Sequence, residues 1–261
     1  MIFTDQTGHS FQLNKKPERI ISLVPSQTEF LFDLGLENSI IGITKFCIHP
    51  KELTKKIQKI GGTKTLNLDL IISLNPDLII ANKEENTKEE IEFLKSKFPV
   101  YISDIYTLSD ALKMMKDIGE ITNKSTEAKE IINKINSEFN LLNKSLINKK
   151  VIYLIWKKPY MAAGKNTFIN QIISLAGFNN IIEGRYPELS FEEIKNYLAD
   201  IILLSSEPYP FKDKHIEELK SLASQVLLVD GELFSWYGSR LQYTPQYLNL
   251  LIEKINGKTW N

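Results

Sequence analysis

The sequence predicts an α/β fold: two lobes with mostly parallel sheets, joined by one long α-helix. Three observations predict it. Short apolar runs rich in β-branched residues alternate with amphipathic segments, which is typical of parallel sheets covered by helices on both faces. Part of the first half of the chain recurs in the second half. Between the halves lies a long stretch with apolar residues at helical spacing.

The repeat sets the internal symmetry of the chain. The segment DLIISLNPDLIIAN (69–82) matches EEIKNYLADIILLS (192–205) at an offset of 123 positions (192 − 69). The matched acidic positions are Asp69 with Glu192 and Asp77 with Asp200. A second segment, from Ile91, is echoed from Ile216. Two similar lobes normally face each other across a cleft, and clefts between domains bind small ligands, so the repeat predicts an interlobe cleft.

The first lobe, residues 1–107, opens with a hairpin that turns at Gln6-Thr7-Gly8. Its strands are predicted at 20–24, 40–43, 78–81 and 100–102. A helix follows Pro25, with Ser26 and Glu29 predicted to form a capping box, and ends near Gly35.

The predicted interlobe helix covers residues 108–148. This stretch contains no proline and one glycine, and its apolar residues recur at helical spacing, with a break expected near Thr122-Asn123. The second lobe, residues 149–261, then has predicted strands at 151–155, 179–182, 201–204 and 226–229. Helices are predicted at 168–175 and 245–255.

Composition excludes several classes of function. The 261 residues carry 32 basic and 32 acidic side chains, so net charge gives no reason to expect nucleic acid or an anionic membrane as a partner. The single cysteine, Cys47, excludes an internal disulfide, and the three dispersed histidines predict no bound metal. We expect a monomer without a cofactor of its own. The N-terminus lacks the pattern of a signal peptide, so the sequence as written predicts a cytoplasmic protein.

Two motifs carry a family resemblance. The first is PERIISLVPSQTEFLFDLG near the start, and the second is IGGTKTLNLDLIISLNPDLIIA in the first lobe. Together with the long helix between the lobes, they resemble the substrate-binding proteins of ABC importers for ferric siderophores, heme and cobalamin. The resemblance covers essentially the whole chain. It implies two Rossmann-like lobes, a periplasmic location, a metal chelate as the ligand and an importer permease as the partner.

The resemblance also implies a role for the matched acids. In this family one acidic residue on each lobe docks on permease arginines, and these positions correspond to Asp69 and Glu192. Pairing of a carboxylate with arginine is strong and geometrically specific. The alternative is that both acids only favour helix N-termini through the helix dipole. Both interpretations stay open at the level of sequence.

Family ligands contact loops at the carboxyl ends of the strands, as ligands of open α/β sheets generally do. The residues that these loops contribute here are Ser26, Gln27, Phe46, Thr63, Lys64, Asn82, Trp156, Arg185, Tyr186, Tyr209, Trp236, Tyr237 and Arg240.

The most suggestive of these loops is FSWYGSR, which places Trp236, Tyr237 and Arg240 within five residues. Aromatic rings with an arginine fork suit a planar or chelate ligand. Alternatively, one aromatic packs in the core and the arginine caps the tail helix. Trp156, at the end of a predicted strand, is equally consistent with a position in the cleft and with one in the core.

A cleft mouth containing Lys64, Lys157, Lys158 and Arg185 would favour an anionic chelate, and the alternative is that these are solvated surface side chains.

Three functions therefore compete. A purely structural interaction protein would be compatible with an exposed Trp236-Tyr237 patch, but the repeat favours a ligand cleft. Two functions then remain. The first is a non-enzymatic importer receptor for an iron chelate, heme or cobalamin. The second is a cytoplasmic corrinoid- or metal-chelate-handling protein, or an enzyme, on the same scaffold. An enzyme would need a phosphate loop or a nucleophile with its base, and neither glycine-rich motif is present. Glu207 is the best isolated acid for such a role.

Overall fold

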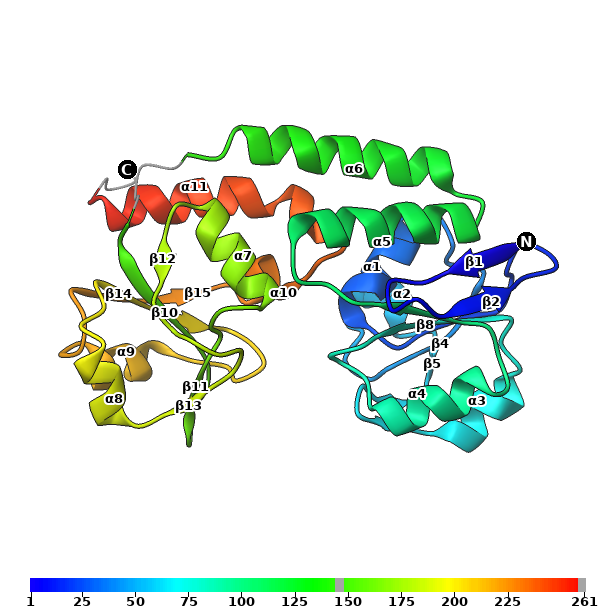
Figure 1. Ribbon diagram of the computed structural model, residues 1–261, viewed down its shortest axis with the longest axis horizontal. Helices are drawn as coiled ribbons and strands as arrows, with labels where there is room; N and C mark the ends of the chain where they lie inside the picture. The colour runs from blue at the N-terminus through cyan, green and yellow to red at the C-terminus, as the bar shows by residue number, and fades with distance from the viewer. Residues whose placement is uncertain (144–147, 258–261) are drawn as a thin grey trace. The chain divides into compact units, whose positions relative to one another are not determined.

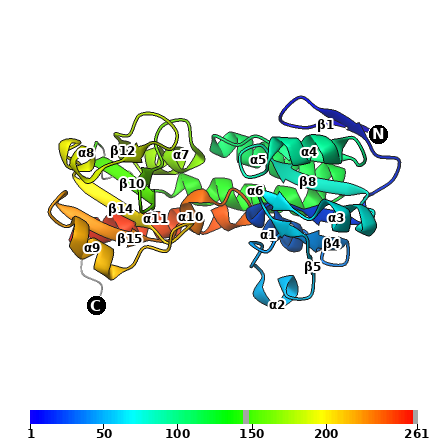
Figure 2. The ribbon, with the colours of Figure 1, turned by 90° about the horizontal axis from the view of Figure 1, so that it is seen from below.

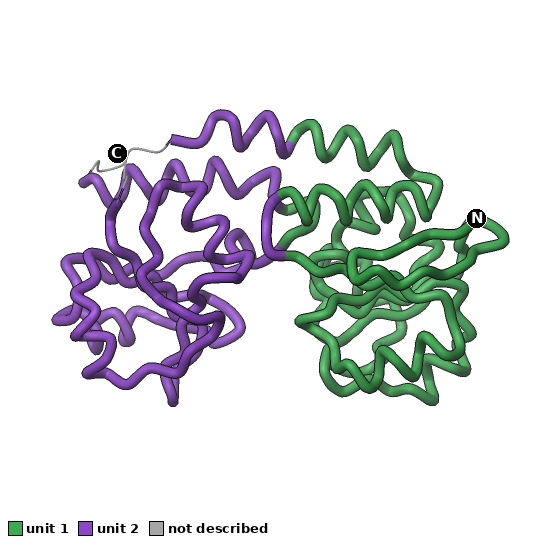
Figure 3. The backbone as a smooth tube through the Cα atoms, in the orientation of Figure 1, with its two compact units in different colours: residues 1–105, 109–134, 237–240 green, residues 106–108, 135–236, 241–261 purple. Residues whose placement is uncertain are grey.

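The structure, a computed structural model, describes residues 1–143 and 148–257. The chain forms two compact units (Figure 3). Unit 1 comprises residues 1–105, 109–134 and 237–240, and unit 2 comprises residues 106–108, 135–236 and 241–261. The end of the predicted interlobe helix, 144–147, and the end of the predicted second lobe, 258–261, lie outside the described residues.

Unit 1 is built on a parallel sheet of five strands in the order β5-β4-β3-β8-β9. The bounds are β3 Ile20–Ser22, β4 Ile40–Ile43, β5 Gln58–Lys59, β8 Leu78–Asn82 and β9 Val100–Ser103. Strands β3, β8 and β9 are buried along their whole length, as their apolar runs predict for a sheet covered on both faces. Two small hairpins, β1 (Ile2–Thr4) with β2 (Ser10–Gln12) and β6 (Gly61–Gly62) with β7 (Thr65–Leu66), complete the strands.

Helices cover both faces of this sheet. They are α1 Pro25–Asp33, α2 Lys51–Thr54, α3 Leu68–Leu74, α4 Lys88–Lys95 and α5 Leu108–Ile121. Figures 1 and 2 show α3 and α4 over one face, and Figure 1 shows α1 and α5 on the other. The predicted capping box is wrong: α1 begins at Pro25 with Val24 as its N-cap, so Ser26 already lies within the first turn.

The predicted interlobe helix is two helices. After α5, helix α6 runs Ser125–Asn140, and the boundary between the units falls inside it, after Lys134. The break lies where the sequence predicts one, because Asn123 adopts a left-handed backbone (φ 57°) that asparagine tolerates and that ends a helix. Gly119 lets the two helices approach, since a Cβ there would lie 2.6 Å from the Cβ of Ala128.

Unit 2 has a mixed sheet in the order β13-β11-β10-β14-β15, with β12 also paired to β10. The bounds are β10 Lys150–Trp156, β11 Tyr160–Ala162, β12 Asn179–Asn180, β13 Glu188–Leu189, β14 Ile201–Ser205 and β15 Gln225–Val229. The central strands β10, β14 and β15 are parallel, and β11 is antiparallel to both of its neighbours. Two α/β units with mostly parallel sheets confirm the predicted fold class.

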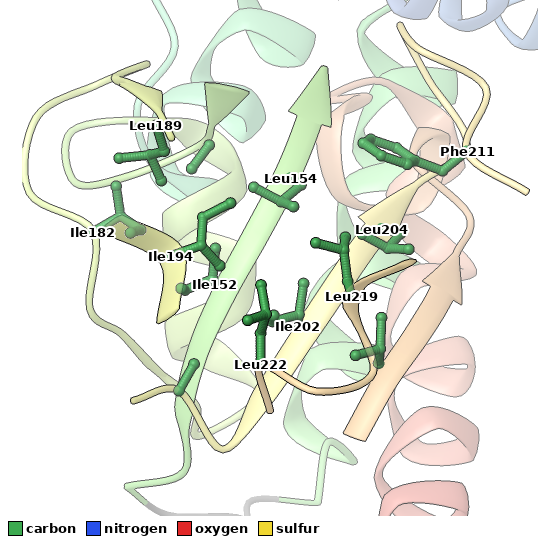
Figure 4. Close-up of a cluster of buried hydrophobic side chains, with 13 residues drawn as sticks. Ile152, Leu154, Ile182, Leu189, Ile194, Ile202, Leu204, Phe211, Leu219 and Leu222 are labelled. Atoms are coloured by element: carbon green, nitrogen blue, oxygen red, sulfur yellow. The ribbon is translucent and has the colours of Figure 1, made fainter. Parts of the chain in front are cut away.

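The helices of unit 2 are α7 Phe168–Leu175, α8 Phe191–Asn196, α9 Asp213–Leu219, α10 Glu232–Ser235 and α11 Thr244–Ile255. A short 3-10 turn, Ser239–Gln242, spans the boundary between unit 1 and unit 2 after Arg240. Alternate residues of β10 and β14, such as Ile152 and Ile202, point toward Ile194 of α8 and Leu219 of α9 in one buried cluster (Figure 4). On the other face, Tyr153 packs against Phe234, with ring centroids 5.0 Å apart.

The sequence repeat is a structural repeat. The elements α3, β8, α4 and β9 correspond to α8, β14, α9 and β15. The matched aspartates accept equivalent hydrogen bonds from the backbone in the two copies. Asp77 accepts backbone N–H groups of Glu18 and Arg19, each at 2.9 Å, and Asp200 accepts that of Lys150 at 2.8 Å. Each carboxylate therefore ties the start of its own strand to the start of the neighbouring strand.

Candidate functional site

The carboxyl edge of the sheet in unit 1 is a connected polar network. The amide nitrogen of Asn82 donates to the carbonyl and hydroxyl of Ser103, at 3.2 and 3.0 Å. The amide of Asn86 donates to the carbonyl of Thr63 at 3.0 Å, which ties the β6–β7 turn to the loop after β8. Of the predicted ligand residues, Asn82 and Thr63 thus contribute to holding the loops in place.

Gln27 and Ser26 lie in the first turn of α1, at the end of β3. Both are buried, and the amide nitrogen of Gln27 donates to the hydroxyl of Ser103. No described residue donates a hydrogen bond to Oε1 of Gln27. A buried acceptor of this kind needs a donor from water or a ligand to recover its cost of desolvation.

Two predicted residues of unit 1 point to solvent. Phe46, in the loop after β4, is 50% exposed, and the ammonium of Lys45 lies 5.1 Å from its ring centroid. Lys64 is exposed in the turn between β6 and β7. An apolar ring beside the ammonium of Lys45, at a sheet edge that also carries the exposed Lys64, suits a ligand with a flat apolar part and negative charge.

The segment from Ser235 to Arg240 is held by carboxylates rather than left open. In unit 2, the Trp236 indole N–H donates to Oε1 of Glu207 at 2.9 Å, and the Ser235 hydroxyl donates to the same oxygen at 2.7 Å.

In unit 1, the Tyr237 hydroxyl donates to Glu85, and Arg240 forms a two-pronged pair with Glu29, at 3.0 and 2.6 Å. Gly238 lies so close to the backbone of Ser26 that a Cβ would stand 2.2 Å from its carbonyl oxygen. Trp236, Tyr237 and Arg240 are therefore anchored within their own units.

Burial of Glu207 predicts a pH-dependent stability. Burial raises the pKa of Glu207 above its ordinary value of 4.5, against the opposing effect of the hydrogen bond from Ser235. The folded protein thus binds this proton more tightly than the unfolded chain, and stability falls as pH rises from about 4.5 through the raised pKa. Glu207→Gln keeps the acceptor oxygen and does not titrate. We expect the difference in melting temperature between this variant and the wild type to grow by about 2–4 °C in favour of the variant as the pH rises from 4.5 through the raised pKa. Parallel melting curves across this range would refute the assignment.

The carboxyl end of β10 in unit 2 carries an aromatic row. Trp156 is 41% exposed and stands edge-on to Tyr209, with ring centroids 5.7 Å apart. The Tyr209 ring in turn lies next to the rings of Phe211 and His215, with centroid distances of 4.8 and 5.7 Å. Since Phe211 and His215 are buried, the row is rooted in the core and ends in an exposed indole.

Beside this row lies a hollow of about 570 Å³. It is lined by Lys157, Lys158, Pro159, Tyr160, Leu189, Ser190 and Glu218. Lys157 pairs with Glu218, while Lys158 is exposed in the turn between β10 and β11.

Arg185, another predicted ligand residue, donates from Nε to the carbonyl of Asn166 at 2.9 Å. Its guanidinium lies over the rings of Tyr106 and Tyr186, at 5.0 and 5.7 Å from their centroids.

The matched acids Asp69 and Glu192 occupy the second position of α3 and α8. Other residues cap these helices: Asn67 caps α3, and Ser190 with Glu193 forms the capping box of α8. Asp69 is exposed and has no hydrogen bond or ion pair to any described residue. Glu192 is exposed, with Lys195 at 3.9 Å. Neither carboxylate is needed as a side-chain cap.

Sequence reasoning missed the partners of the predicted residues. Ser103 and Asn86 organise the edge of unit 1, and Glu29, Asp33 and Glu85 hold the 237–240 segment, where the Ser239 hydroxyl donates to Asp33. Ser103 was open to prediction, since it ends β9 as Asn82 ends β8, and the two residues are paired in these adjacent parallel strands. The acidic partners carry no local signal.

Among residues 1–143 and 148–257, no group of three or more histidine, cysteine, aspartate and glutamate side chains could hold a metal ion. No helix in the described part of the chain is long and apolar enough to cross a membrane.

The chain thus has two α/β units, each with polar and aromatic side chains on the loops at the carboxyl ends of its parallel strands. The model of the periplasmic binding protein family matches residues 20–225, so the chain belongs to that family.

Several proteins similar to this chain are named for the binding of vitamin B12 or heme. The chain is 25% identical over 241 residues to a vitamin B12-binding protein of Pectobacterium carotovorum, covering 89% of this chain and 87% of that protein. It is 27% identical over 187 residues to an uncharacterized ABC transporter substrate-binding lipoprotein of Bacillus subtilis, covering 67% and 59%. Its fold matches the periplasmic heme-binding protein RhuT of Roseiflexus with a TM-score of 0.77 at 20% identity, covering 92% and 98%.

Proposed function

We propose that this chain is the substrate-binding receptor of an ABC importer, and that its cargo is a metal chelate: a ferric siderophore, heme or cobalamin. The observation that carries the proposal is the exposed Trp156, braced edge-on by Tyr209 at the carboxyl end of β10. A rigid aromatic surface of this kind binds flat ligands at low entropic cost. The named relatives bind vitamin B12 or heme, which agrees with this ligand class.

Charge supports the same class of ligand. Lys45 and Lys64 are exposed at the carboxyl edge of unit 1, and Lys158 is exposed at that of unit 2. These cations would attract the carboxylates of heme or the oxygens of a siderophore. In this proposal the chelate is held in the cleft that the sequence repeat predicts, the receptor is a monomer, and it needs no cofactor of its own.

To deliver its chelate, the receptor must dock on a membrane permease from the side outside the cytoplasm. The exposed carboxylates of Asp69 and Glu192 occupy equivalent positions in the two copies, and other residues cap their helices. They would pair with arginines of the permease, one on each half. Glu207, the best candidate for an enzymatic acid, is engaged in hydrogen bonds to Ser235 and Trp236, which favours a receptor over an enzyme.

Tryptophan fluorescence tests the proposal. Hemin, cyanocobalamin and a set of ferric siderophores are titrated into the protein and into its Trp156→Phe and Trp236→Phe variants. We expect saturable quenching by one chelate at micromolar or lower concentration. Trp156→Phe should lose most of the quenching and weaken binding about tenfold, because the stacking surface is reduced.

Trp236→Phe is the matched control, since its indole is buried and bound to Glu207. It should retain the affinity. Quenching by none of the chelates would refute the proposed cargo, and equal losses in both variants would remove Trp156 from the binding surface.

A further inference from the structure

The two copies of the repeat differ on the surface around the matched acids. Asn75 ends α3 with a left-handed backbone (φ 43°), its N–H bonded to the carbonyl of Ile72 at 3.0 Å. Leu198, at the matching position after α8, has the same backbone (φ 49°) and the same bond, to Lys195 at 3.2 Å. The two turns are thus alike in geometry and unlike in side chain.

Leucine is a poor residue for that turn. Its Cβ disfavours a left-handed backbone, which glycine and asparagine adopt readily. Leu198 is also 73% exposed, so packing within unit 2 does not compensate for the strain. Local strain of this kind, combined with an exposed apolar side chain, points to a contact outside the unit.

A second exposed apolar residue lies at the other end of α8. Phe191, its first residue, is 40% exposed and directly precedes Glu192. The corresponding residue of the first copy, Leu68, is half-buried, and the large apolar side chain exposed on that copy is Ile72, at 37%. We call Phe191, Glu192 and Leu198 the α8 face.

The surface next to this face is hollowed. The cavity of about 570 Å³ reaches Leu189 and Ser190, the two residues that precede Phe191. It could receive one side chain of a partner, bordered by the Lys157–Glu218 pair.

We infer that the α8 face is an apolar contact surface for the importer permease, and that it makes docking of the two units unequal. The permease segment that fits it presents an arginine for Glu192 with apolar side chains on either side. An exposed carboxylate whose nearest cation is 3.9 Å away leaves room for that arginine. The inference rests on the proposed function, because it takes the partner to be the permease.

Exchanging the two turn residues tests the inference. The probe is the organism's own chelate-importer complex of permease and ATPase in lipid nanodiscs, with docking measured by surface plasmon resonance. Leu198→Asn should melt about 2–4 °C higher and dock about tenfold more weakly, since it loses strain and apolar contact together. Asn75→Leu is the matched control, which should melt lower and dock as the wild type does.

The outcomes separate the two claims. One outcome is that Leu198→Asn docks as the wild type does, while Glu192→Gln docks more weakly. That outcome would overturn the claim that the α8 face contacts the permease, and it would leave the receptor function standing. No docking by the wild type would overturn both. Weaker docking by both exchanged variants would overturn the inequality, because the contact would then be general to both turns.

Discussion

Arg240→Ala is expected to lower the free energy of unfolding by about 2–3 kcal/mol. The guanidinium and the Glu29 carboxylate form a two-pronged pair whose side chains are only 18% and 15% exposed. Removing the arginine leaves a largely buried carboxylate without its cation. Burial already raises the pKa of Glu29 despite the arginine, so the charged form depends on this partner. The residual exposure sets the expected loss below that of a fully buried pair.

Equilibrium unfolding in urea measures this effect. The matched control is the double variant Glu29→Met with Arg240→Met, which removes both charges and should cost much less than Arg240→Ala alone. Arg240→Lys should fall between the two, because an ammonium cannot bridge both carboxylate oxygens as the guanidinium fork does. A loss under about 0.5 kcal/mol for Arg240→Ala would place the pair among ordinary surface ion pairs.

Neutralising the two matched acids is expected to uncouple docking from ligand capture. Asp69→Asn and Glu192→Gln should each weaken docking on the permease about tenfold, since each removes one carboxylate–arginine pair. The double variant should bind its chelate with wild-type affinity, because neither carboxylate lies among the predicted ligand residues. Melting temperatures should change little, as both side chains are exposed.

Docking affinity and chelate affinity, measured side by side on the same preparations, check this prediction. The control is Asp77→Asn, at the other acid of the repeat. This variant should lose stability, because Asp77 holds two backbone N–H groups, and it should dock normally once folded. If the docking acids were only helix-dipole residues, the double variant would lose stability and keep its docking affinity.

The fold was largely predictable from local pattern. The strands from Ile20, Ile40, Leu78 and Val151 lie where short β-branched runs place them, because a buried parallel strand must be apolar on both faces. The helix break was predictable from Thr122-Asn123, and helix α7 from its apolar spacing. The capping box failed because a proline at the first helical position moved the helix start one residue ahead of Ser26.

The site was less predictable, because its partners are distant in sequence. Glu29 and Arg240 are 211 positions apart, and Glu85 and Tyr237 are 152 apart. Nothing in the spacing of FSWYGSR distinguishes an arginine that awaits a ligand from one that pairs with its own chain. Leu198 illustrates the converse: an ordinary leucine in the sequence becomes informative only when its left-handed backbone and 73% exposure are known.

Receptor-dependent uptake tests the central claim most directly. Proteoliposomes containing the importer are supplied with ATP and with the chelate that quenches Trp156, and accumulation of that chelate is measured with and without this protein. The account predicts uptake that requires the protein and is lost with the Asp69→Asn, Glu192→Gln double variant, which still binds the chelate. Uptake at the same rate without the protein, or undiminished uptake with the double variant, would contradict it.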